Sequence, residues 1–113
     1  MVSRTFISAV MAVVLLNLSP LALAEDLPTF QITTKDGYFT PETLEVPAGK
    51  KFRVTVKNAG SGPEEFESRE LMKETVIAAG VTRSLVFAPL KPGVYKFFGE
   101  FHKDTAKGLI VVK

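Results

Sequence analysis

Short runs of alternating apolar and polar residues, separated by turn signals at regular intervals, constrain the fold of this 113-residue chain most strongly. The alternation extends over residues 30–34, more briefly over 44–46, and over a full strand length at 52–58. Such alternation places one row of side chains in a core and the other in solvent, as in a half-buried β-strand. Turn signals and further strands complete the pattern, with turns expected at 35–37, 46–49, 58–63, 79–80 and 90–93 and strands at 75–77, 84–87, 94–98 and 109–112. The sequence therefore predicts an all-β fold, either a β-sandwich or a small barrel.

Residues 67–74 depart from this pattern because they contain good helix formers and show no alternation. We therefore expect a short helical turn or an irregular loop there. The sequence contains no internal repeat, low-complexity tract or linker, which favours a single domain.

The first 24 residues have the organisation of a secretory signal peptide. Arg4 precedes an apolar stretch at 6–16, and the segment ends in Ala22-Leu-Ala24, which fits an A-x-A cleavage site. We predict a signal peptide at 1–24 and an exported mature domain at 25–113. The alternative is an uncleaved membrane anchor, since residues 6–24 are nearly long enough to span a bilayer.

Composition excludes several classes of function. The chain has 14 basic and 12 acidic residues, and removal of Arg4 leaves a net charge of about +1. This balance, with basic residues scattered over alternating strand positions, predicts no nucleic-acid partner. Cysteine is absent, as are a Gly-x-Ser-x-Gly elbow and a phosphate-binding loop, so nucleophilic catalysis and nucleotide binding are disfavoured.

Carboxylates gather in the segment Pro63-Glu-Glu-Phe-Glu-Ser68. In an extended segment successive side chains alternate faces, so Glu65 and Glu67 project together, whereas Glu64 and Phe66 take the other side. Two carboxylates at one strand end form a chelating pair. Judged alone, however, these glutamates, together with Glu70, fit a solvated acidic loop better than a metal site.

Four segments resemble a cupredoxin over essentially the whole mature chain. They are 42–50 with its Val-Pro-Ala-Gly turn, 52–58, the Gly-x-Tyr-x-Phe segment at 93–97 and the closing Gly-x-Ile-Val-Val at 108–112. The resemblance implies a Greek-key β-sandwich. The ligand loop of such proteins supplies a cysteine, a histidine and an axial methionine. The resemblance implies that this chain has Gly99 at the cysteine position, keeps the histidine as His102, and has the methionine position near Ala106. A blue-copper site is therefore excluded, because it requires the thiolate.

Two motifs, Pro63-Glu-Glu-Phe-Glu-Ser68 and Phe97-Phe-Gly-Glu-Phe-His102, resemble the EfeO-type cupredoxin-like family of bacterial iron-uptake systems. This resemblance implies a periplasmic protein that binds or oxidises iron, or binds copper. It also implies two partners, a membrane iron permease and a periplasmic iron-binding protein.

We predict a metal site formed by Glu65, Glu67, Glu100 and His102. In cupredoxins the segment after the third strand supplies the first His ligand, and here Glu65 or a neighbour occupies that place. Three carboxylates and one imidazole suit iron or Cu(II) better than Cu(I). Met72 and Asp104 are weaker candidates, and the site could be shared across a homodimer. Whether the protein would act as an oxidase or as a carrier is left open.

The competing hypothesis is a β-sandwich without metal that serves as a partner-binding module of an export or uptake complex. In this case the same loop end docks onto the partner through exposed aromatic residues such as Phe101. His102 would then be a surface or hydrogen-bonded residue, which is the more frequent role of a lone histidine.

Overall fold

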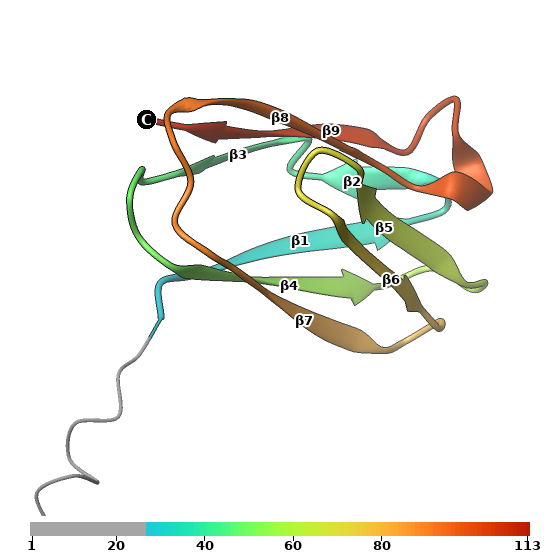
Figure 1. The fold of residues 1–113 in the computed structure, drawn as a ribbon. Coiled ribbons are helices and arrows are strands. Elements are labelled where there is room, and N and C mark those ends of the chain that lie inside the picture. The colour runs from blue at the N-terminus through green and yellow to red at the C-terminus, as the bar shows by residue number, and fades with distance from the viewer. Residues whose placement is uncertain (1–26) are drawn as a thin grey trace, which may run out of the picture.

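The computed structural model describes residues 27–113, which form two packed β-sheets (Figure 1). The nine strands of this part of the chain are β1 (Thr29–Lys35), β2 (Tyr38–Thr40), β3 (Thr43–Val46), β4 (Phe52–Asn58), β5 (Glu64–Ser68), β6 (Lys73–Ile77), β7 (Thr82–Phe87), β8 (Gly93–Phe98) and β9 (Lys107–Val112). A single turn of 3-10 helix, η2 (Glu100–His102), lies between β8 and β9. The prediction of an all-β sandwich is confirmed.

The chain passes repeatedly between the two sheets. The four-stranded sheet has the order β2-β1-β4-β7, and the five-stranded sheet has the order β3-β9-β8-β5-β6. Parallel pairing joins β1 to β4 and β3 to β9, whereas the remaining pairs are antiparallel. The order places β5 between β6 and β8, so both neighbours and the η2 turn can contribute side chains near β5.

Aromatic packing fills the space between the sheets. Phe66 of β5 lies 4.8 Å from Phe97 and 6.2 Å from Phe39, measured between ring centroids. Phe52 and Phe87 stack at 4.8 Å in a second group. These rings are almost wholly buried. Buried aromatic side chains contribute large apolar areas, which accounts for a stable small domain in a chain without cysteine.

Two elements differ from the expectations for the sequence. β2 was not expected, and residues 67–74 do not form a helical turn or irregular loop as a whole. They instead contain the end of β5, a turn at 69–72 and the start of β6. The expectation was wrong because Phe66 and Ile77, which flank the turn, are both buried in the core. Burial of such residues outweighs weak helix propensity.

The predictions for the N-terminus lie outside the described residues, both the signal peptide at 1–24 and the alternative anchor at 6–24. Within residues 27–113 no helix has the length and apolar character needed to cross a membrane.

Candidate metal centre

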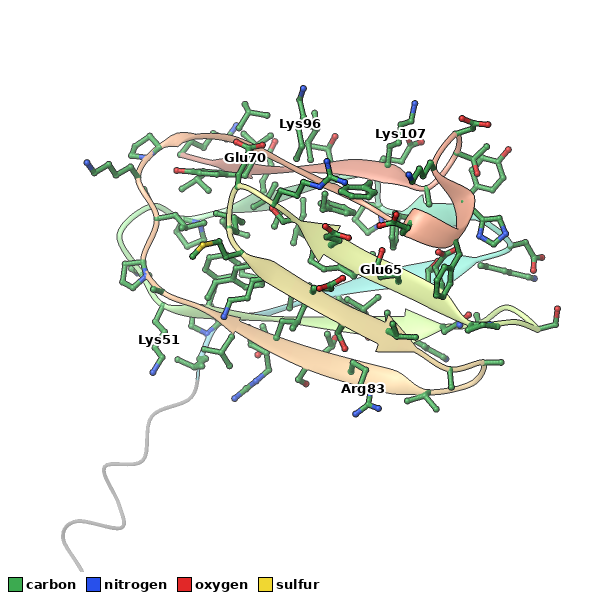
Figure 2. All side chains as sticks on the ribbon, turned by 45° about the vertical axis from the view of Figure 1, so that its right-hand side comes forward. Lys51, Glu65, Glu70, Arg83, Lys96 and Lys107 are labelled. Atoms are coloured by element: carbon green, nitrogen blue, oxygen red, sulfur yellow. The ribbon has the colours of Figure 1, made fainter. Side chains whose placement is uncertain are left out.

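The structure brings three of the predicted ligands together on β5 and η2. Glu65, Glu67 and Glu100 each offer a carboxylate oxygen, and these oxygens lie within 4.8 Å of one another. Glu65 and Glu67 occupy the outer face of the five-stranded sheet, because Phe66 between them points into the core. Figure 2 labels Glu65 on the part of the sheet formed by β5 and β6. The alternation of an extended strand thus produces the pairing of Glu65 with Glu67.

Glu65 is the most enclosed of these carboxylates, with only 4% of the residue exposed. Burial raises the pKa of Glu65 from its ordinary value of 4.5 to about 7. The backbone N–H of Glu100, which donates a hydrogen bond to Glu65 Oε1 at 2.8 Å, opposes this increase. A side-chain hydrogen bond with Glu74 and the nearby charge of Glu67 raise the pKa further. Near neutral pH this group can therefore release or take up a proton.

Glu74 adds a fourth carboxylate that was not predicted from the sequence. It lies directly opposite Glu67 in the β5–β6 pair, and its side chain hydrogen-bonds with Glu65. We refer to Glu65, Glu67, Glu74 and Glu100 as the carboxylate cluster. The β5–β6 hairpin, with its turn at 69–72, pairs Glu67 with Glu74. This hairpin was not expected from the sequence, because the helix formers in the segment favoured a helical turn or loop.

His102, the fourth predicted ligand, is placed elsewhere. Its Nδ1 lies 2.6 Å from Glu64 Oε2, and Glu64 is 3% exposed. Glu64 shares the inward side of β5 with Phe66, whereas the carboxylate cluster occupies the outer side. His102 and Glu64 therefore form a separate pair beside a small cavity of about 190 Å³, which is also lined by Asp36 and Asn58.

Gly99 leaves the space that the Glu64 carboxylate uses. A Cβ atom at Gly99 would lie 2.7 Å from Glu64 Oε1, 2.7 Å from the Glu65 carbonyl oxygen and 3.1 Å from the Cβ of Ala106. Any side chain at this position would have to displace Glu64 or the β5 backbone. The space beside Gly99, the residue that the resemblance assigns to the cysteine position, is thus filled by a carboxylate from β5.

The remaining candidates stand apart from the carboxylate cluster. Met72 is 86% exposed in the turn between β5 and β6. Asp104 is exposed in the turn after η2 and does not belong to the group of Glu65, Glu67 and Glu100. Phe101, proposed as a docking aromatic, is 50% exposed on η2.

Comparison with known proteins identifies the family to which this fold belongs. The sequence model of the cupredoxin-like domain family matches residues 8–112. The chain belongs to this family. It is also 38% identical over 104 residues to a protein of Rickettsia prowazekii (strain Madrid E) named Uncharacterized protein RP394, an alignment that covers 92% of this chain and 83% of the relative.

Several solved structures share the fold. Dithionite-reduced auracyanin from Roseiflexus castenholzii has a TM-score of 0.64 at 15% identity, covering 79% of this chain and 99% of that chain. A purple cupredoxin from Nitrosopumilus maritimus has a TM-score of 0.56 at 25% identity, with coverages of 74% and 99%. The metal binding domain of the Cu(I) exporting P-type ATPase CopA from Streptococcus pneumoniae D39 has a TM-score of 0.66 at 18% identity, with coverages of 75% and 84%.

The donor atoms of this cupredoxin-like chain differ from those of a blue-copper site. The chain has no cysteine, and its single histidine is paired with Glu64. The carboxylate cluster offers oxygen donors, which suit hard cations and are poor ligands for Cu(I). The carboxylates of Glu65, Glu67 and Glu100, whose oxygens lie within 4.8 Å of one another, repel one another when ionised, and a bound cation would offset that repulsion. The cluster therefore fits a divalent or trivalent ion with a preference for oxygen.

Proposed function

We propose that this protein is an exported, periplasmic cupredoxin-like protein that binds iron through the carboxylate cluster and acts in iron uptake. The observation that supports this most directly is the group of Glu65, Glu67 and Glu100, whose carboxylate oxygens lie within 4.8 Å of one another. Glu74 supplies a further oxygen donor at the same place. Iron is the cargo in this proposal.

Iron is favoured over copper at the cluster because every donor there is a carboxylate oxygen. Such ligands stabilise Fe(III) relative to Fe(II), so Fe(II) held by these residues would be easier to oxidise. The chain could therefore carry iron or assist its oxidation. Cu(II) is the competing ion, and the imidazole of His102 beside Glu64 is a more suitable donor for it than the cluster is.

The resemblance to EfeO-type cupredoxin-like proteins, carried by the motifs at 63–68 and 97–102, supports the place of this protein in a pathway. We propose that it delivers iron to a membrane iron permease, together with a periplasmic iron-binding protein. The alternative is a partner-binding module without metal. It rests on exposed residues such as Phe101, which lies on η2 next to Glu100 of the carboxylate cluster.

Metal titration tests this proposal. Metal-free mature protein is titrated with Fe(II) under anaerobic conditions and with Cu(II), and compared with a Glu65→Gln/Glu67→Gln variant. We expect the variant to bind Fe(II) at least about tenfold more weakly, because two charged ligands become neutral. Glu45→Gln, an exposed glutamate of β3 paired with Lys113, is the matched control and should bind Fe(II) like the wild type.

Equal Fe(II) binding by the double variant and the wild type would contradict the proposal. The partner-binding alternative would be favoured if Fe(II) did not bind and Phe101→Ala abolished capture of the permease.

A further inference from the structure

A groove with cationic walls lies on the outer face of the five-stranded sheet, next to the carboxylate cluster. Its volume is about 630 Å³. Four of its lining residues are cationic, and they come from the β5–β6 turn, β8, the turn after η2 and β9: Arg69, Lys96, Lys103 and Lys107. Figure 2 shows Lys96 and Lys107 projecting away from the sandwich on the same side. We call this the cationic groove.

The floor of the cationic groove is apolar. In the β8–β9 pair Lys96 lies opposite Leu109, and Phe98 lies opposite Lys107, so cationic and apolar side chains alternate diagonally. The guanidinium of Arg69 lies 5.0 Å from the centroid of the Phe98 ring. A ligand here would therefore meet positive charge at the rim and carbon surface beneath it.

The four cationic residues divide into two pairs. Arg69 Nε is 3.4 Å from Glu67 Oε2, and Lys103 Nζ is 3.4 Å from Glu100 Oε1, so both already contact members of the carboxylate cluster. Lys96 and Lys107 take part in no ion pair within the described residues. Two amines are thus free for an anion, and two further cations connect the groove to the cluster.

The size and charge of the groove favour a small anion. A volume of about 630 Å³ is typical of sites for small organic molecules. Several cations around one groove match a ligand with more than one carboxylate, and the apolar floor matches its carbon chain. Glu42 is the one acidic residue among the lining residues, against four cations. The Glu70 carboxylate also lies beside the groove, where its Oε1 accepts a hydrogen bond from the Lys96 backbone N–H at 2.9 Å.

We propose that the cationic groove binds a small organic polycarboxylate, and that Arg69 and Lys103 couple this site to the carboxylate cluster. The coupling rests on the proposed function, because it requires a cation at the cluster. An iron ion bound there competes with Arg69 and Lys103 for Glu67 and Glu100. The released side chains can then turn to the anion. Since coupling between two sites is reciprocal, the anion also strengthens iron binding.

The groove itself is tested without metal. Tricarballylate, a tricarboxylate that lacks the hydroxyl group of a strong chelator, is titrated into metal-free mature protein by calorimetry. A Lys96→Met/Lys107→Met variant should bind it about tenfold more weakly or worse, since two charge-assisted contacts are lost. The charge-matched control is Lys51→Met/Arg83→Met, whose residues are exposed and lie at the opposite edge of the molecule in Figure 2.

Amide chemical shifts give a second measurement on the wild-type protein. Binding in the groove should move the resonances of residues 96–98 and 107–109 and leave those around Lys51 unchanged. An equal loss of affinity in the control variant, or no saturable binding of tricarballylate, overturns the groove proposal. Shifts produced by an acidic peptide such as hexaglutamate but not by tricarballylate overturn the assigned occupant.

The coupling is tested by repeating the titration with Fe(II) at saturation under anaerobic conditions. We expect the affinity for tricarballylate to rise about fivefold or more, and the rise to disappear in Arg69→Met/Lys103→Met. Unchanged anion affinity in the presence of bound Fe(II) overturns the coupling. If Fe(II) does not bind at all, the proposed function and the coupling fail together, and the metal-free titration still decides the groove.

Discussion

At the scale of single residues, the distinctive feature is a buried carboxylate beside three others. Glu65 owes its raised pKa mainly to burial, and it accepts a hydrogen bond from the Glu100 backbone. Its placement could be predicted, because alternation along an extended strand assigns Glu65 and Glu67 to one face. The partner of His102 could not, since it depends on how the η2 turn folds back over β5.

The metal-free protein should lose stability as the pH rises through neutrality. The pKa of Glu65 is about 7 in the folded protein, above its ordinary value of 4.5, so the folded state binds more protons between these values. Protonated Glu65 makes its full contribution to the free energy of unfolding below about pH 4.5, and this contribution is lost as the pH rises to about 7. Its size is on the order of 3 kcal/mol. Urea unfolding at pH 5 and pH 8 measures it, and Glu65→Gln should remove this part of the difference. An unchanged difference in Glu65→Gln would show that another group is responsible.

A cysteine introduced at position 99 should not create a blue-copper site. A Cβ at Gly99 would lie 2.7 Å from both Glu64 Oε1 and the Glu65 carbonyl oxygen, so Gly99→Cys should destabilise the protein by about 1–3 kcal/mol. Urea unfolding and the visible spectrum with Cu(II) test both parts. A strong thiolate-to-copper absorption band with unchanged stability would show that Glu64 does not fill the ligand position.

At the scale of secondary structure, the β5–β6 hairpin assembles most of the carboxylate cluster. The strands with clear alternation, such as β4, were predictable from their apolar and polar pattern. The hairpin was not, because Glu70, Leu71 and Met72 favour helix locally, and only the packing of Phe66 and Ile77 in the core selects two strands. Glu74 was missed for the same reason, since its position opposite Glu67 depends on the hairpin register.

Like charges directly across a strand pair are destabilising, so Glu74→Gln should stabilise the metal-free protein by about 0.2–1 kcal/mol. The same change should weaken Fe(II) binding, because it removes an anionic donor from the cluster. Chemical unfolding of the metal-free protein and an anaerobic Fe(II) titration measure the two effects. A variant that loses stability without iron, or binds Fe(II) as tightly as the wild type, would contradict the role assigned to Glu74.

At the scale of the whole molecule, the two packed sheets place different chemistry on the two sides of β5. The inner side holds the Glu64–His102 pair at the end of the aromatic core, and the outer side holds the carboxylate cluster. Strand spacing and turn signals predicted a β-sandwich or small barrel, and the resemblance of four segments implied its cupredoxin-like form. The separation of His102 from the carboxylates was not predictable, because it is set by packing between β5 and η2.

Export of the whole chain, which we predict from its first 24 residues, would determine which metal ions the protein encounters. We expect a signal peptidase to cleave after Ala24, since small residues occupy both positions of the A-x-A site. Mass spectrometry of the protein from a periplasmic fraction should give a mature N-terminus at Glu25. Recovery of the full-length chain in the membrane fraction would favour an uncleaved anchor.

The central claim is that the carboxylate cluster binds iron, and the most direct test is a crystal structure of the mature protein soaked with Fe(II). Anomalous diffraction at the iron absorption edge locates the metal independently of the coordinates. Our account predicts an anomalous peak among the side chains of Glu65, Glu67 and Glu100, within coordination distance of their oxygens. A peak at the Glu64–His102 pair alone, or no peak in crystals that contain iron in solution, would contradict it.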